Sequence, residues 1–332
     1  MDKVLTCQSK VLKLLLVGML AALFYSSTNV INRLISIDGG HWLWTASMRY
    51  AFMIVLLFAI ITFWYGKSAM SEVLSIFKQH WKFWVIAGGI GHGLFYAAYC
   101  IGFVYTHGWV VITIFNLNLI FTPIILLVFG KKVPIKGVLL LALIFIGVFL
   151  INIEQYQQIG MKDLLYGVVP AFFSAFFFPL GNQLLGEAQS GGNSKWKIPN
   201  ITNPMIQKPL VRVMLMAMGS VPFWLVLILS VGLTAQPTFP TVDQVSKILV
   251  VALLSGIAAT SIFYYARHQL AVTPYEIALT ESTLASEIIF TLIGEVVFVG
   301  IIASPGPLGF AGIMLVVIGF ILLGIKRNAV KT

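Results

Sequence analysis

A succession of apolar runs, each long enough to cross a lipid bilayer as a helix, constrains this chain more than any other feature. A spanning helix needs about 20 mostly apolar residues, and ten runs in the 332 residues meet this requirement. They cover residues 11–34, 42–65, 82–105, 109–129, 134–153, 163–185, 209–232, 246–270, 274–298 and 307–325. Only 10% of the residues are charged and the mean hydropathy is +0.96, which excludes a large soluble domain. We therefore expect an all-α membrane protein with ten transmembrane helices.

The basic residues alternate between the two sides of these runs, which predicts the orientation of the chain. With the N-terminus in the cytoplasm, seventeen of the 21 Lys and Arg side chains fall on the cytoplasmic side. Three fall outside and Arg49 lies within the second run. This positive-inside bias predicts cytoplasmic N- and C-termini in a multi-pass protein of the cell membrane, and it explains the net charge of +10 without a nucleic-acid partner.

The ends and connections of the runs support the same organisation. Basic residues precede the first run as in a signal peptide, but the run continues to Leu34 without a small-residue cleavage site. We expect it to remain as an uncleaved first helix. Residues 71–79 predict a short amphipathic helix at the membrane surface. The polar stretch 186–208 is expected to be a flexible cytoplasmic linker.

Weak self-similarity divides the chain near residue 157 into two halves of five spans, residues 1–157 and 158–332. Because five is odd, the halves must have opposite orientations in the membrane. The matches occur in the same order in both halves. They pair Asn32-Arg33-Leu34 with Asn182-Gln183-Leu184, Phe95-Tyr96 with Phe263-Tyr264, Gly130 with Gly294, and Gly137 and Gly147 with Gly309 and Gly319. Inverted repeats of this kind are typical of secondary transporters, whose solute site lies near the midplane between the halves.

On these residues the chain resembles the drug/metabolite transporter superfamily, and its ten-helix branch of multidrug resistance efflux transporters in length and loop pattern. The superfamily signature is Gly followed by Glu or another polar residue at the end of helices four and nine, and Gly ten residues apart in helices five and ten. Gly294-Glu295 fits, whereas Gly130-Lys131 lacks the acidic residue. The resemblance extends from Val11 to Ile325. It implies a secondary transporter that exports or exchanges a small organic solute by alternating access.

Acidic residues in the ninth run are the first candidates for solute or proton handling, because ionisable groups in hydrocarbon are costly. Glu281 and Glu287 lie deep in the run and about 120° apart around a helix. Each is a candidate for binding a cation, carrying a proton in coupled transport, or making a structural pair. Glu295 lies near the end of the run, where we expect it to brace the helix.

Other polar residues within the runs complete the set of substrate-binding or coupling candidates. They are Asn29 in the first run, Arg49 in the second, His92 and Tyr96 in the third, Asn116 and Asn118 in the fourth, and Tyr264 in the eighth. Arg49 is expected to pair with an acid, to extend to the headgroups, or to bind an anionic substrate group. The tyrosines offer cation–π surfaces, and the asparagines and His92 are also candidates for structural hydrogen bonds between helices. The glycines Gly89 and Gly93 predict a close helix contact.

Other function classes lack their motifs. The chain has no phosphate-binding loop, no His-Glu-x-x-His pair and no Gly-x-Ser-x-Gly elbow. Its five histidines are scattered and form no metal-ligand pattern. We therefore expect neither an enzyme nor an ATP-driven pump, and no cofactor or metal. A lipid or lipid-linked-sugar translocase and a non-transporting membrane sensor remain as alternatives. The solute, the coupling ion, the direction of transport and the oligomeric state stay open.

Overall fold

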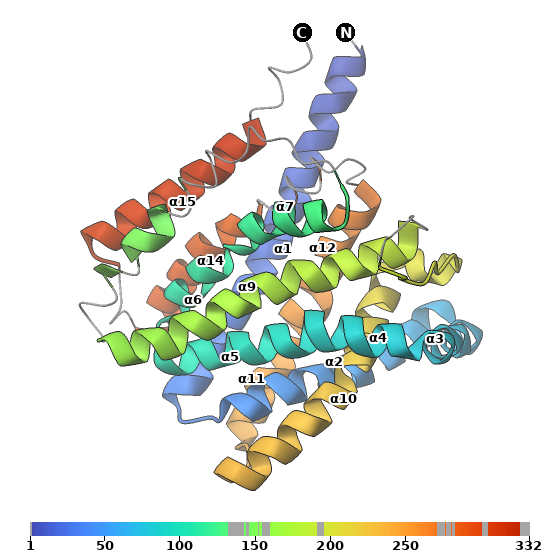
Figure 1. Ribbon diagram of the computed structural model, residues 1–332, viewed down its shortest axis with the longest axis horizontal. Coiled ribbons are helices and arrows are strands. Elements are labelled where there is room, and N and C mark those ends of the chain that lie inside the picture. The colour runs from blue at the N-terminus through green and yellow to red at the C-terminus, as the bar shows by residue number, and fades with distance from the viewer. Residues whose placement is uncertain are drawn as a thin grey trace.

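The computed structural model describes residues 2–131, 143, 146–151, 153–154, 160–190, 196–270, 276, 280, 283–300 and 305–325. All regular structure in this part of the chain is helical (Figure 1). The first half contains α1 (Asp2–Ile37), α2 (Trp42–Tyr65), α3 (Lys67–Gln79), α4 (Trp81–Gly88), η1 (Gly89–Leu94), α5 (Phe95–Tyr105), α6 (Gly108–Phe115) and α7 (Asn118–Val128). The second contains α9 (Met161–Ser190), η3 (Pro204–Gln207), α10 (Pro209–Ala235), α11 (Val242–Val251), η4 (Ala252–Ala259), α12 (Thr260–Tyr265), η5 (Ala266–Leu270), η6 (Thr283–Ala285), α14 (Ser286–Gly294), η7 (Glu295–Val299) and α15 (Pro307–Ile325).

Seven helical stretches in the described ranges are long and apolar enough to cross a membrane. They are 12–37, 42–65, 81–105, 108–128, 164–189, 209–235 and 242–268. These agree with seven of the ten predicted runs to within a few residues. The predicted run 134–153 lies largely outside the described residues, as does the first part of 274–298. The last run coincides with α15, and the predicted helix at 71–79 is α3, which begins earlier, at Lys67.

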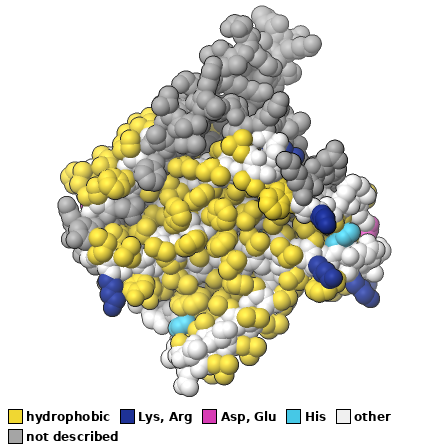
Figure 2. Space-filling model, in the orientation of Figure 1, with side chains coloured by type: hydrophobic (Ala, Val, Ile, Leu, Met, Phe, Trp, Pro, Cys, Tyr) yellow, Lys and Arg dark blue, Asp and Glu magenta, His cyan; other side chains and the backbone are white. Residues whose placement is uncertain are grey.

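The outer surface matches what a lipid environment requires. Apolar side chains cover the middle of the face drawn in Figure 2, and most of the Lys and Arg side chains visible there lie at the right-hand edge, near α3. On α10, Leu225, Leu229 and Leu233 repeat every fourth residue and are 57%, 65% and 82% exposed. Large exposed apolar side chains at helical spacing form a stripe suited to contact with lipid.

The first helix of each predicted half packs into the other half. α1 contacts α14, η4 and α12 from the second half, and α9 contacts α5, η1, α6 and α7 from the first. α10 likewise packs against α2 and α4. Figure 1 shows α1 beginning and α15 ending on the same side of the molecule. The two halves therefore interlock and share one interior.

Glycines allow the helices of the two halves to approach closely. A Cβ atom added at Gly219 on α10 would lie 2.0 Å from the backbone oxygen of Trp84, and one at Gly181 on α9 would lie 2.3 Å from the Cα atom of Gly91. The predicted contact at Gly89 is wrong, because a Cβ atom there would meet nothing within 4 Å. Gly93 does pack closely, against the ring of Phe223.

The helices around the interior are not regular throughout. The third and eighth predicted spans contain the π-helical segments η1 and η4, and Asn116 and Leu117 form a turn between α6 and α7. The ninth predicted span contains the 3₁₀ turn η6 directly before α14. π-helical turns are frequent at functional sites, and interrupted membrane helices are tolerated where the freed backbone faces protein or water.

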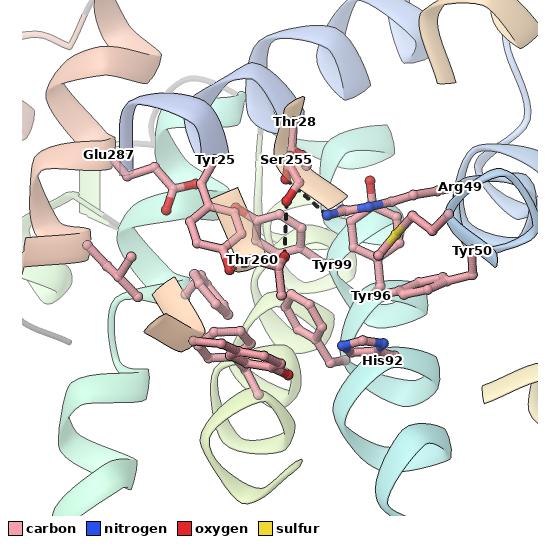
Figure 3. A pocket seen from close by; sticks show the side chains of 16 residues that line it. Tyr25, Thr28, Arg49, Tyr50, His92, Tyr96, Tyr99, Ser255, Thr260 and Glu287 are labelled. Atoms are coloured by element: carbon pink, nitrogen blue, oxygen red, sulfur yellow. Dashed lines mark hydrogen bonds between the residues drawn. The ribbon is translucent and has the colours of Figure 1, made fainter. Parts of the chain in front are cut away.

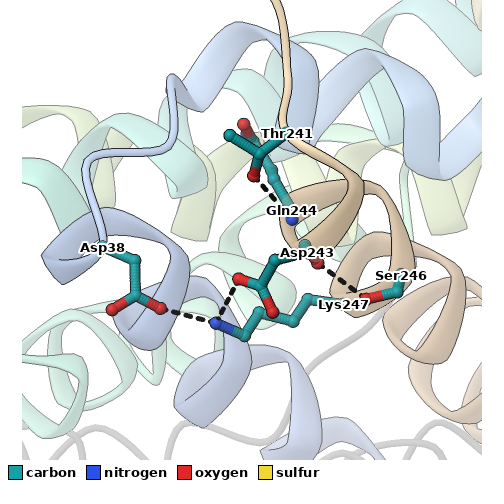
Figure 4. Close-up of polar contacts among 6 residues, drawn as sticks. All are labelled: Asp38, Thr241, Asp243, Gln244, Ser246 and Lys247. Atoms are coloured by element: carbon teal, nitrogen blue, oxygen red, sulfur yellow. Dashed lines mark hydrogen bonds and ion pairs between the residues drawn. The ribbon is translucent and has the colours of Figure 1, made fainter.

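Polar contacts join helices at both ends of the bundle. Lys247 on α11 lies 2.5 Å from an oxygen of Asp38, just after α1, and 2.7 Å from an oxygen of Asp243 (Figure 4). Gln244 lies in the first turn of the same helix, and its side-chain amide donates to the His41 carbonyl and to Thr45 Oγ1. Elsewhere, the Lys131 ammonium lies 3.0 Å from Glu187 Oε1 on α9.

We predict that Gly219→Ala destabilises the protein by about 1–3 kcal/mol, the usual cost of overpacking. The new methyl group would collide with the backbone of α4, which has no flexible end to move aside. Gly232→Ala is the matched control on the same helix, because a Cβ atom there meets nothing within 4 Å. Thermal unfolding in detergent measures both. Equal melting temperatures for the two variants would contradict the close contact between α4 and α10.

Candidate functional site

A small cavity of about 40 Å³ lies at the centre of the bundle (Figure 3). Its walls come from α1, α2, η1, α5, α6, α9, η4, α12, η6 and α14, so both predicted halves contribute. This volume suits a few water molecules, whereas sites for drug-sized ligands are about 300–1,000 Å³. In this structure the cavity is therefore too small to hold a drug-sized ligand.

Glu287 reaches this cavity from the first turn of α14 and is held by Asn29 of α1. The Asn29 Nδ2 atom donates to Glu287 Oε1 at 2.8 Å and to Thr291 Oγ1 at 2.8 Å. Its Oδ1 atom accepts from the Tyr99 hydroxyl at 2.6 Å. Asn29 is fully buried and Glu287 is 4% exposed. One amide thus joins α1, α5 and α14 beside a buried carboxyl group.

Arg49 enters the cavity from α2. Its Nη2 atom donates to Ser255 Oγ at 2.9 Å, and its guanidinium lies 4.1 Å from the centroid of the Tyr96 ring. The side chain does not extend to the headgroup region, because the residue is only 4% exposed. No carboxylate among the described residues lies within ion-pair distance of it. Of the expected roles, pairing with an acid is therefore not seen in this part of the chain.

Glu287 and Arg49 approach the cavity from opposite sides. Figure 3 shows the carboxyl group at one side and the guanidinium at the other, with Tyr25, Tyr99 and Thr260 between them. The Tyr25 hydroxyl donates to Thr260 Oγ1 at 3.2 Å. The space between two buried ionisable side chains is thus bordered by hydroxyl groups and aromatic rings.

The remaining candidates divide into those at the cavity and those away from it. His92, Tyr96 and Tyr264 line the cavity, with His92 stacked on Tyr50 at a ring distance of 5.0 Å. Asn116 and Asn118 are buried but are not among the lining residues. The Asn116 amide donates to the Ile112 carbonyl of its own helix. Glu281 lies outside the described residues.

Sequence reasoning missed several lining side chains, including Tyr25 and Ser255. A signal for the first was present, because Tyr25, Thr28, Asn29 and Asn32 have the spacing of one helix face. Together these four residues form a polar face of the first span, and such a face is expected to point toward the protein interior. Ser255 carried no such signal, since a single serine in an apolar run is common in packed membrane helices.

A larger groove of about 740 Å³ lies apart from these residues. It runs beside α4, α7 and α9, and its lining includes Trp81, Ile86 and Val128, each more than half exposed. A groove of exposed apolar side chains on the outside of a membrane protein is accounted for by contact with lipid. The central cavity is the better candidate, because its ionisable side chains Arg49 and Glu287 are buried, whereas Lys82 and Lys197 of the groove are exposed.

Comparisons with known proteins extend over nearly the whole chain. The family described as "Putative multidrug resistance efflux transporter" matches residues 12–329. An uncharacterized protein, YjlA of Bacillus subtilis (strain 168), is 28% identical over 324 residues, covering 94% of each chain. An uncharacterized 42.1 kDa protein of Shouchella clausii, from the 3′ region of an intracellular alkaline protease, is 32% identical over 88% of this chain and 75% of its own. A crystal structure covering 96% of this chain and 99% of its own has a TM-score of 0.62 at 12% identity, a likeness of fold.

We predict that Asn29→Ala lowers stability more than Asn116→Ala. Removing Asn29 leaves Glu287 and Tyr99 without their partner inside the bundle, which costs about 1–3 kcal/mol. The Asn116 side chain bonds only within its own helix, and its Oδ1 atom has no partner, so its loss is expected to be nearly neutral. Thermal unfolding of the two variants in one detergent makes the comparison. A larger loss at Asn116 would contradict the assigned network.

Proposed function

This chain belongs to the putative multidrug resistance efflux transporter family of the drug/metabolite transporter superfamily, and from that premise we propose that it exports a small organic solute as a secondary transporter. The observation that carries the proposal is the central cavity, which a buried carboxyl group and a buried guanidinium border from opposite sides. Ionisable groups at such depth are costly. A solute that contacts them explains why they are there.

We propose that residues 1–157 and 158–332 are inverted repeats of five helices, giving ten spans. The packing supports this, because α1 sits against the eighth and ninth predicted spans as α9 sits against the third and fourth. The paired π-helical segments η1 and η4 support the same correspondence. The Lys and Arg side chains that gather near α3 support cytoplasmic connections on that side.

Transport would proceed by alternating opening of the two ends around the cavity. A drug-sized solute needs several times the present 40 Å³, so the helices must separate before it binds. The contacts that close the Asp38 end are between exposed groups, with side chains 25–63% exposed. Exposed ion pairs contribute only about 0–1 kcal/mol each. The solute's own contacts in the open form are sufficient to offset the loss of such pairs.

We propose Glu287 as the group that exchanges a proton for solute. Its carboxyl group is buried with one direct side-chain donor, Asn29, and a buried charge requires either a partner or neutralisation. A proton can neutralise the Glu287 carboxylate, and a cationic group of the solute can replace that proton by pairing with the ionised carboxylate. The loop histidine His107 is not a competing pH sensor, because burial lowers its pKa to about 4 and leaves it neutral from pH 5 to 8.

Reconstitution of the purified protein into vesicles distinguishes the two alternatives, a non-transporting sensor and a lipid translocase, from a solute transporter. A non-transporting sensor binds solute but gives no flux, whereas a lipid translocase moves labelled lipid between leaflets and leaves water-soluble solutes inside the vesicles. The family is one of transporters, which favours flux of small solutes and not enzymatic turnover.

We predict that Glu287→Gln abolishes the response of export to a proton gradient. Vesicles containing the purified protein are loaded with a mixture of organic cations, amino acids and nucleosides, and the released solutes are identified by mass spectrometry. For one proton per solute, a gradient of one pH unit supports about tenfold accumulation in the wild type, and none in the variant. Glu295→Gln is the control, since glutamine can still accept from the Gly108 N–H. An unchanged response in Glu287→Gln would reject proton exchange at this residue.

A further inference from the structure

Among the described residues, no anion lies within ion-pair distance of the cation in the cavity. The Arg49 guanidinium is bonded to one neutral hydroxyl, Ser255 Oγ, and rests on the Tyr96 ring. Its Nε atom is buried with no hydrogen-bond partner within the described part of the chain. Buried charges in proteins are normally paired. An anionic group of a ligand would supply the missing counter-charge and hydrogen-bond acceptors, because the five N–H donors of Arg match a carboxylate or phosphate.

Glu287, on the opposite wall, likewise has no charged partner among the described residues. Glu287 accepts one direct hydrogen bond from the Asn29 amide, and no ammonium or guanidinium lies within ion-pair distance among the described residues. Tyr25 and Tyr99 border the space in front of it. A carboxylate flanked by aromatic rings is well suited to an ammonium group, through charge and cation–π contact together.

Two further polar atoms at the cavity lack partners. The Thr28 hydroxyl and the Nδ1 atom of His92 are buried, and neither has a hydrogen bond in the described structure. Buried polar atoms without partners are few in native proteins and point to water or ligand. With the Nε atom of Arg49, three side chains from α1, α2 and η1 therefore present unused hydrogen-bonding atoms at one small space.

The balance of charge selects the kind of solute. With Glu287 ionised, the two side chains sum to zero, so the site is neutral as a whole. A simple cation would pair with Glu287 but leave Arg49 uncompensated, and a simple anion would do the reverse. A molecule that carries both charges satisfies both walls, and each mismatched ligand leaves one buried charge unpaired.

We infer that the solute is a small zwitterion that carries an ammonium and a carboxylate, with the ammonium toward Glu287 and the carboxylate toward Arg49. This inference rests on the proposed function, because it names the solute of the same cavity. It also gives proton exchange a direction. When Glu287 takes up a proton, the ammonium loses its partner and the solute is released.

The test compares compounds that share side chains and differ only in charge. Vesicles containing the protein are loaded with the twenty amino acids, β-alanine and 4-aminobutanoate, each with its amide (a cation) and its N-acetyl derivative (an anion). Export is followed by mass spectrometry, and leakage from protein-free vesicles is subtracted. We expect the zwitterions to leave about 10- to 100-fold faster than the amides, the effect of one charge-assisted hydrogen-bonded contact. Preferred export of amides or N-acetyl compounds overturns the inference and leaves the transporter intact.

Variants connect the selectivity to the two residues. Arg49→Gln is expected to reduce the zwitterion-to-amide ratio at least tenfold, and Arg49→Lys to retain most of it. Arg33→Gln is the matched control, because Arg33 donates to the Phe103 carbonyl and does not line the cavity. Elution as a single species in gel filtration establishes that each variant is folded. An Arg49→Gln protein with the wild-type zwitterion-to-amide ratio overturns the inference. If Arg49→Gln fails to fold, the same ratio is measured for Ser255→Ala, which removes the hydrogen-bond acceptor of the Arg49 Nη2 atom.

A binding measurement separates failure of the solute class from failure of transport. The same compounds are added to detergent-purified protein, and the rise in melting temperature reports binding to the folded state. Stabilisation by zwitterions without export upholds the inference and rejects the transporter. If none of these compounds stabilises the protein or is exported, the inference is overturned, and the transporter proposal is then decided by the mixture of organic cations and nucleosides.

Discussion

The polar interior of this protein depends on the three hydrogen bonds of the Asn29 side chain. In hydrocarbon no water replaces a missing partner, so the carboxyl group of Glu287 and the hydroxyl of Tyr99 can be buried together only if something joins them. The Asn29 amide does so with both of its polar atoms, and it extends to Thr291 as well. Three helices that are distant in the chain are thereby fixed around a cavity that would otherwise be too polar for a membrane interior.

The same network explains why α1 lies at the centre. A helix that carries Tyr25, Thr28, Asn29 and Asn32 on one face cannot show that face to lipid, so it must be surrounded by protein. α14, η4, α12 and α5 provide that surrounding. On the other side of the interior, glycine contacts such as Gly181 against Gly91 let α9 approach η1 closely. Polar bonds and small residues therefore hold the two halves together by different means.

The sequence predicted seven of the ten expected spans to within a few residues, because a bilayer imposes the same length and apolarity on every spanning helix. Arg49, Glu287, His92, Tyr96 and Tyr264 were also found, since ionisable and aromatic side chains at depth are conspicuous in apolar runs. What it could not predict is the pairing between helices. Asn116 was a candidate for a hydrogen bond between helices, yet its amide donates to the Ile112 carbonyl of the preceding helix, α6. Glu287 and Arg49 are brought to one cavity by long-range packing, of α14 against α1 and of α2 against η4, which no local pattern records.

The distribution of strong and weak contacts indicates where the molecule can move. Asp38, Asp243 and Lys247 meet in a partly exposed setting, where ion pairs contribute little, whereas the Asn29 contacts are buried and costly to break. Beside the cavity, η1 carries His92 and η4 carries Ser255, and both segments are π-helical. π-helical turns within α-helices are frequent at functional sites. Rearrangement at these two segments would alter the walls near Arg49 while leaving the Asn29 junction whole, which is the requirement for opening a cavity without unfolding its centre.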